Sequence, residues 1–123
     1  RGLIVDESLI SQGDFTEIGG YTAMQKLLIQ KPDAVFVASD TMALGAIQAV
    51  QKAGLSVPGD VGIIGFDDLS PSTLLTPALT TVRQPIKRAG RIAVETLVDM
   101  LAHGVQPARR IILPTELVIR DSC

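Results

Sequence analysis

Short apolar segments alternate with helix-length segments along this sequence, and this alternation constrains the fold more than any other feature. Continuous apolar runs occur at residues 34–38 and 61–66, and shorter strand candidates occur at 9–12, 79–83, 111–113 and 116–120. Apolar runs of this length are typical of strands that are buried on both faces of a sheet. Because parallel strands need a long crossover, usually a helix, the pattern predicts an α/β fold with a parallel, Rossmann-like sheet flanked by helices.

Capping residues mark the ends of the predicted helices. Thr16 is placed to cap a helix that continues to about residue 30, and Asp40 is placed to cap a second helix that ends near residue 53. Gly54 directly after the second helix is a typical stop signal. Pro85 predicts the start of a third helix, because proline is favoured in the first turn, and this helix is expected to end at Gly104.

Composition and cysteine usage are those of an ordinary globular domain. The chain has 123 residues, of which 46% are hydrophobic, with a net charge of −2 and no dense basic stripe of the kind that binds nucleic acid. The single cysteine, Cys123, cannot form an intrachain disulfide, so we expect a cytoplasmic protein, with a periplasmic location as the alternative. The chain opens at Arg1 without a methionine, and we expect an N-terminal portion to precede it.

Polar and aromatic residues follow each predicted strand. In open α/β sheets, ligands bind in the crevice at the carboxyl ends of the strands. The residues expected there are Asp14 and Phe15, Ser39 and Asp40, Asp67 and Asp68, and Gln84. Carboxylate and amide oxygens accept hydrogen bonds from hydroxyl groups, and an aromatic ring covers the apolar side of a sugar or stacks on a planar base. This set predicts a binding site for a polyhydroxylated small molecule.

Several of these residues have a structural alternative. Asp40 is expected to act as a helix cap rather than a ligand-binding residue. Asp68 either binds ligand or satisfies the turn that follows it, and Phe15 either contacts ligand or packs in the core. Asp67 is the strongest single candidate, because a carboxylate at the end of a buried strand is costly without a partner.

The residue sets that catalysis would need are missing from the sequence. The single histidine, His103, has no Ser/His/Asp arrangement around it, and we find neither metal-ligand spacing nor a glycine-rich phosphate loop after a strand. We therefore expect no enzyme activity, no metal site and no cofactor.

Six motifs in series resemble the C-terminal subdomain of the lac/galactose repressor (LacI/GalR) family. They are GDFT at 13–16, ASDTMALGA at 38–46, VPGDV at 57–61, IGFDD at 64–68, LTTVRQP at 79–85 and LPTELVIRDS at 113–122. The resemblance implies a periplasmic-binding-protein-like fold of two α/β subdomains with an effector between them. Residues 1–83 would form the C-terminal subdomain, 84–113 would cross to the N-terminal subdomain, and 114–123 would return. The DNA-binding domain would lie outside this chain.

The same resemblance assigns roles to individual residues. Phe15 resembles the aromatic residue that stacks on the effector, Asp67 the acid that accepts hydrogen bonds from it, and Gln84 the polar residue at the crossover. Ser39 stands where sugar-binding members often carry Asn, and we expect it to contact the effector from that position. A sugar or sugar derivative is favoured over a purine as the effector.

A dimer is also implied. On a helical projection of residues 41–53, Leu44 lies away from the face that points to the sheet. Related repressors dimerise through this helix and the loop after the Asp-Asp pair, which contains Leu74 and Leu75. We therefore expect a two-fold interface that includes Leu44 and Leu75.

The function implied is that of a ligand-responsive repressor that binds operator DNA through an N-terminal helix-turn-helix. The alternative is a periplasmic sugar-binding protein of an ABC transporter, which shares the fold. The LTTVRQP and LPTEL segments favour the repressor.

Overall fold

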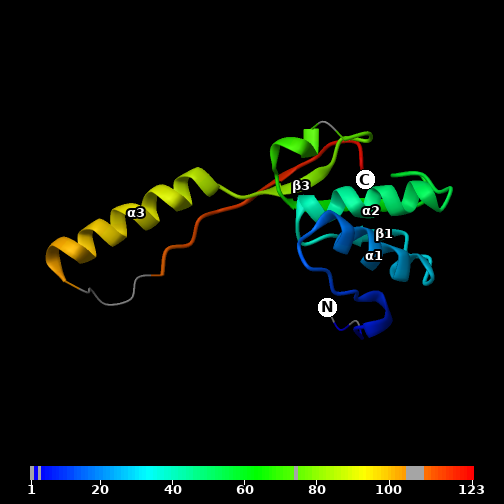
Figure 1. Ribbon diagram of the computed structural model, residues 1–123, viewed down its shortest axis with the longest axis horizontal. Helices are drawn as coiled ribbons and strands as arrows, with labels where there is room; N and C mark the ends of the chain where they lie inside the picture. The colour runs from blue at the N-terminus through cyan, green and yellow to red at the C-terminus, as the bar shows by residue number, and fades with distance from the viewer. Residues whose placement is uncertain (1, 3, 74, 105–109) are drawn as a thin grey trace.

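The computed structural model describes residues 2, 4–73, 75–104 and 110–123, which form a compact lobe and one long arm (Figure 1). The lobe combines α-helices with a sheet, and the arm consists of a further helix and the extended segment that returns from it. In chain order the elements are η1 (Glu7–Leu9), α1 (Glu17–Leu28), β1 (Ala34–Phe36), α2 (Asp40–Lys52), β2 (Gly62–Asp67), η2 (Ser70–Thr73), β3 (Thr80–Arg83), α3 (Ile86–His103) and β4 (Glu116–Val118).

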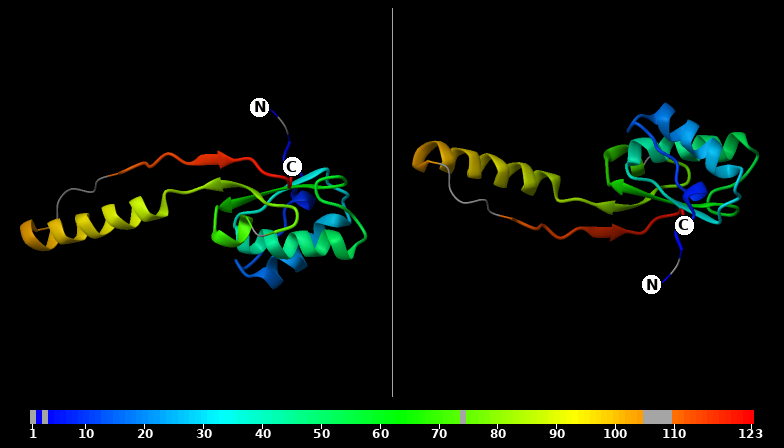
Figure 2. Two further views of the ribbon diagram at one scale, coloured as in Figure 1. Left: turned by 90° about the horizontal axis from the view of Figure 1, so that it is seen from above. Right: turned by 90° about the horizontal axis from the view of Figure 1, so that it is seen from below.

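The sheet has four strands in the order β1-β2-β3-β4. β1 pairs with β2 and β2 with β3 in parallel, as the alternation of strands and helices predicts. β4 pairs with β3 in an antiparallel manner, because the chain leaves the lobe along β3 and comes back along β4 (Figure 2). The α/β fold is therefore confirmed, with one antiparallel strand that the sequence pattern did not predict.

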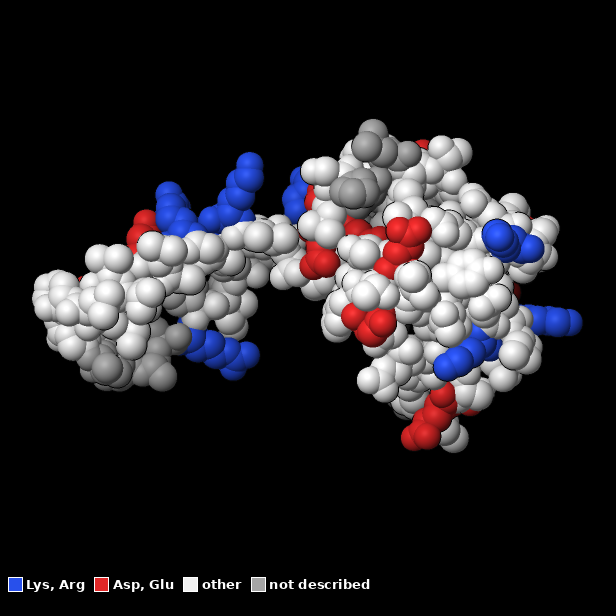
Figure 3. Space-filling model, viewed as in Figure 1, with Lys and Arg blue, Asp and Glu red and all other residues white. Residues whose placement is uncertain are grey.

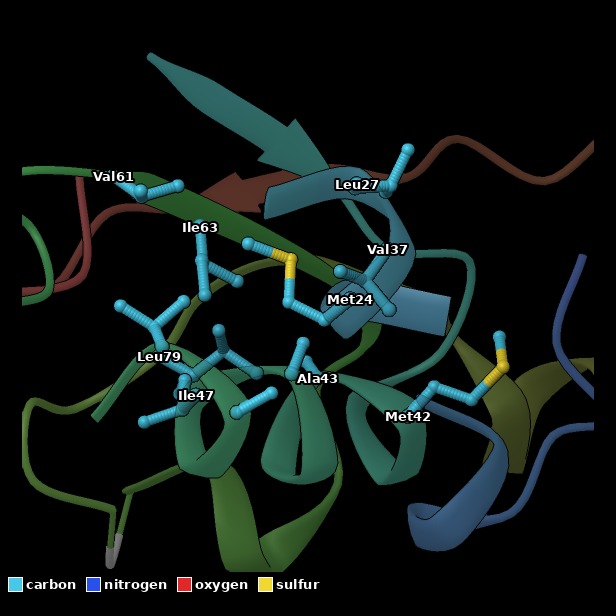
Figure 4. Packing of buried hydrophobic residues seen from close by; sticks show 12 residues of the cluster. Met24, Leu27, Val37, Met42, Ala43, Ile47, Val61, Ile63 and Leu79 are labelled. Carbon is cyan, nitrogen blue, oxygen red and sulfur yellow. The ribbon is translucent and has the colours of Figure 1, made fainter. Parts of the chain in front are cut away.

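The apolar core lies between the sheet and the two helices that cover one of its faces. Its central side chains are at most 3% exposed and point into the same cluster (Figure 4). They are Met24 of α1, Ile47 of α2, Ile63 of β2 and Leu79, which directly precedes β3. The helix face predicted to point at the sheet is buried throughout: Ala43, Ala46, Ile47 and Val50 are 0–3% exposed.

Helices α1 and α2 approach each other closely at Gly45. A Cβ atom added there would overlap the backbone oxygen of Glu17 and would lie 2.7 Å from the backbone nitrogen of Tyr21. Since both are backbone atoms, only glycine fits at this position without moving one helix.

β1 does not behave as a strand buried on both faces, and that expectation was wrong. Phe36 is 61% exposed, and its ring contacts Phe66 edge-to-face with the ring centres 6.3 Å apart. The reason is that β1 is at the edge of the sheet and the helices cover only one face, so the second face is left open.

Two of the shorter predicted strands are also absent. Residues 9–12 were expected to form a strand, but the chain there forms the short turn η1 and then an irregular segment. The backbone nitrogens of Leu9 and Ile10 donate to the carbonyls of Asp6 and Glu7 at 3.1 Å each, and these local bonds take the place of strand pairing. Residues 111–113 are likewise irregular, because β4 begins only at Glu116, where β3 supplies a partner.

The helix ends follow the predicted capping logic, with one correction. The Thr16 hydroxyl accepts from the Gly19 backbone at 3.0 Å, and Gly54 has a φ of 78° at the end of α2. The cap of α2, however, is Ser39 and not Asp40, since the Ser39 hydroxyl accepts from the Met42 backbone at 3.2 Å. Asp40 is the first residue of the helix, and its carboxylate makes longer-range contacts described below.

The arm extends away from the lobe, and its helix is poorly buried (Figure 1). Pro85 immediately precedes α3, and no residue of α3 is buried. None of the described helices is long and apolar enough to cross a membrane.

The C-terminal residues tie the lobe together. Ser122 is 0% exposed; its hydroxyl accepts from the Thr80 backbone at 2.8 Å and donates to the Ile63 carbonyl at 2.6 Å. This one hydroxyl therefore joins β2 and β3.

Candidate functional site

The carboxyl ends of β1, β2 and β3 meet at one edge of the sheet, and unusual backbone conformations cluster there. Three non-glycine residues at this edge have positive φ values: Phe15 at 63°, Asp67 at 115° and Asp68 at 57°. Non-glycine residues rarely adopt such values, and strained backbone of this kind concentrates at functional sites. Among the described residues the fourth non-glycine residue with positive φ is Lys31, which precedes β1, so three of the four lie at the edge predicted to bind a ligand.

Asp67 and Gln84 are brought into direct contact. The Gln84 side-chain nitrogen donates to Asp67 Oδ1 at 2.7 Å, and this hydrogen bond is partly buried. Asp67 is the last residue of β2, and Gln84 is the residue between β3 and the arm. A ligand that engages either group therefore acts at the point where the chain leaves the lobe.

Asp68 faces two arginines. Its Oδ2 lies 2.6 Å from Arg83 Nε and its Oδ1 lies 2.6 Å from Arg120 Nη2, with only 10% of the side chain exposed. Burial by itself raises the pKa of Asp68, but hydrogen bonds from Arg120 and Arg83 and the charges of both groups outweigh it, so its pKa lies below the ordinary value. The hydrogen bond between Arg83 and Asp68 raises the pKa of Arg83 in turn. Both oxygens of Asp68 are thus committed to internal partners.

Asp40 supports this edge from beneath. It is 4% exposed, its Oδ1 accepts from the Thr81 hydroxyl at 2.6 Å, and its Oδ2 accepts from the Leu69 backbone at 2.8 Å. A Cβ at Gly65 would overlap Asp40 Oδ1 and lie 2.8 Å from a Leu79 methyl group, so glycine in β2 makes room for the carboxylate. Asp40 therefore holds the backbone that follows Asp67 and Asp68.

Phe15 lies at the same edge but in a different environment. It is 68% exposed and lines a cavity of about 380 Å³ together with Phe36, Val37 and Ala38 at the end of β1. The lining of this cavity is mostly apolar and does not include Asp67 or Gln84. Asp14 stabilises the preceding turn, because hydrogen bonds from the side chain and backbone of Thr16 hold its pKa below the ordinary value.

Ser39, the remaining predicted binding residue, is 5% exposed and caps α2 through its hydroxyl oxygen. Sequence reasoning missed Arg120, Thr81 and Gly65. Only Gly65 carried a usable signal, since a glycine within a strand often marks a close approach by another group.

No group of three or more His, Cys, Asp or Glu side chains among the described residues is arranged to hold a metal ion.

Comparison with known proteins identifies the family. The periplasmic binding protein-like domain matches residues 1–123. The HTH-type transcriptional repressor PurR of Edwardsiella ictaluri is 45% identical over 118 residues, which are 94% of this chain and 35% of that protein. The solved structure of a transcriptional regulator CelR-cellobiose complex is 39% identical and has a TM-score of 0.93, covering 98% of this chain and 38% of that one. The chain belongs to the LacI/GalR family.

Other LacI/GalR structures agree with this assignment. The lac repressor dimer bound to operator and the anti-inducer ONPF is 32% identical with a TM-score of 0.81, over 89% of this chain and 39% of that one. This chain spans about 35% of the length of the PurR relative, so it corresponds to one part of such a protein. The relatives named here are transcriptional regulators rather than transport proteins.

The LacI/GalR dimer residues predicted above lie on neighbouring elements. Leu44 on α2 is half-buried, and Leu75, which follows η2, is half-buried and packs against the core cluster. Leu74 lies outside the described residues.

Proposed function

We propose that this chain is the effector-binding and dimerisation part of a cytoplasmic, ligand-responsive transcriptional repressor. The observation that carries the proposal is the Asp67–Gln84 hydrogen bond at the junction between the lobe and the arm. A small molecule that inserts between the two side chains would contact the lobe through Asp67 and the outgoing chain through Gln84. Such a contact favours one arrangement of the two parts over another, which is what an effector must do.

The chemistry of this edge supports a sugar or a sugar derivative as the effector. Asp67 offers carboxylate oxygens to hydroxyl groups, and the exposed ring of Phe15 offers an apolar face. Ser39 is a weaker candidate for contact, because its hydroxyl oxygen caps α2. The cellobiose in the related CelR complex supports this class of ligand.

The arm supports a division into subdomains with residues 1–83 in one lobe, 84–113 in a second lobe and 114–123 returning. Helix α3 has an apolar face that is 56–79% exposed. It is formed at the i, i+3, i+4, i+7 spacing of one helix side by Val94, Leu97, Val98 and Leu101. Helices in proteins gain most of their stability from packing an apolar face against another body, so we expect this face of α3 to be covered. In the proposed repressor, the N-terminal subdomain covers this face.

Regulation would follow from closure of the two subdomains on the effector. Closure changes whether paired helix-turn-helix units, located outside this chain, fit the two half-sites of an operator. The coupling between effector and operator is expected to be on the order of 1–3 kcal/mol.

The test uses the intact protein that contains this chain. Sugars, sugar phosphates and purines are screened by thermal shift, with cellobiose as the first probe; a ligand at about 100 times its Kd stabilises by roughly 2.7 kcal/mol. Asp67→Ala should abolish the stabilisation and the effect on operator binding, while operator binding without effector survives. Asp33→Ala, which removes an exposed carboxylate at the far side of β1, is the matched control. An unchanged response in Asp67→Ala would remove Asp67 from the site.

The dimer is tested separately. Leu44→Asp places a charge in the proposed two-fold patch with Leu75 and should shift the intact protein toward monomers in sedimentation experiments. Gln30→Asp, which adds the same charge at an exposed position in the turn after α1, is the control, and it should leave the association state unchanged. If Leu44→Asp stays dimeric, the interface lies elsewhere.

A further inference from the structure

The carboxylate of Asp68 contacts both segments that connect the lobe with the arm. Arg83 is the last residue of β3, on the outgoing segment, and Arg120 follows β4, on the returning segment. Each guanidinium group lies 2.6 Å from one oxygen of Asp68. One side chain therefore connects the two places where the chain crosses out of the lobe.

The arginines are themselves anchored to these segments. Arg120 also donates to the Leu79 carbonyl at 2.7 Å, just before β3, so it joins the two segments a second time. β3 and β4 pair through Arg83 and Glu116 at the end nearest the arm. Arg83 reaches Glu116 only at 3.4 Å, and the Glu116 side chain is 70% exposed, so Asp68 is its closer partner.

The backbone around Asp68 is fixed on both sides. The positive φ values of Asp67 and Asp68 turn two adjacent carboxylates toward different partners, Gln84 in one case and the arginines in the other. Asp40 holds the next residue, Leu69, through its backbone nitrogen. The hydrogen bond between Gln84 and Asp67 is the one that a change in the direction of the outgoing chain disturbs. Carboxylates also lie on the surface of the lobe close to the point where the arm leaves it (Figure 3).

Taken together, these contacts point to one role. We propose that Asp68 is a positioning residue that clamps the outgoing and returning segments together, so that β3, β4 and the start of the arm move as one unit. The contact between Asp67 and Gln84 then depends on the direction of that unit. The clamp deepens the proposed function, because it is the element through which occupancy of the site would redirect the second lobe. Its existence does not require an effector.

The experiment measures the geometry of the arm in the intact protein without any ligand. Spin labels are placed through Lys26→Cys on α1 and Glu95→Cys on α3, both exposed positions, with Cys123→Ser removing the native thiol. Asp68→Asn keeps the size of the side chain and removes its charge. We expect a broader distribution of label distances, and roughly 10-fold faster amide exchange in Thr80–Arg83 and Glu116–Val118, with α1 and α2 unchanged.

Control variants distinguish a clamp from a general effect on folding. Glu116→Gln removes the other acidic partner of Arg83 and should change neither the distances nor the exchange. Arg83→Gln removes one of the two Asp68 contacts and should reproduce the local effect at β3, which keeps the test possible if Asp68→Asn does not fold. An unchanged distance distribution in Asp68→Asn would overturn the proposal, and so would a loss of protection that includes α2. If no effector is found, the proposed function is wrong, but the distance and exchange results still test the clamp because they are measured without a ligand.

Discussion

Removing the Ser122 hydroxyl should destabilise the lobe far more than its size suggests. Ser122→Ala deletes one buried oxygen that serves two backbone groups, the nitrogen of Thr80 and the carbonyl of Ile63. Both groups lie in the interior of the sheet, and a buried backbone group that loses its partner costs about 1–3 kcal/mol. Two such groups give an expected loss of about 3 kcal/mol in the free energy of unfolding, which corresponds to a fall of roughly 12 °C in Tm for a chain of this size.

The assay is urea-induced unfolding of the chain followed by far-UV circular dichroism, with the m-value compared between variants. An unchanged m-value shows that the native state is equally compact, so that the difference in midpoint reports stability. Ser8→Ala is the matched control, because it deletes the same hydroxyl from an exposed turn and should cost less than about 0.5 kcal/mol. If Ser122→Ala costs no more than Ser8→Ala, the C-terminal residues do not join β2 and β3 in the way described.

Two further predictions follow from packing and charge. Gly45→Ala should lower stability by about 3 kcal/mol in the same assay, because the added methyl group meets backbone atoms of α1, whereas Gly90→Ala in α3 meets nothing within 4 Å and should not lower it. The pKa of Asp68 is lowered by folding, so its contribution to stability is full above the unfolded pKa of about 3.9 and is lost as the pH falls through the folded value. Asp68→Asn should therefore flatten the acid limb of the stability profile below about pH 4, and an unchanged slope there would contradict the arginine contacts.

Local sequence signals determined much of the fold. Alternating apolar and amphipathic segments predict the parallel α/β core because each crossover between parallel strands needs a helix. Thr16 and Gly54 mark helix ends through interactions that span only a few residues, and such short-range chemistry is visible in the sequence. The placement of Asp67 and Gln84 at one edge also follows, because the ends of parallel strands coincide.

Tertiary structure decided the rest, wherever a group's partner lies far along the chain. Asp40 had the features of a helix cap, yet its carboxylate bonds to Thr81, 41 residues away. The two arginines that hold Asp68 are 15 and 52 residues distant, and Ser122 is 59 residues from the carbonyl that it bonds. No local pattern encodes such pairings, because they exist only once the sheet brings its strands together. The antiparallel return of β4 creates the junction at which these contacts form.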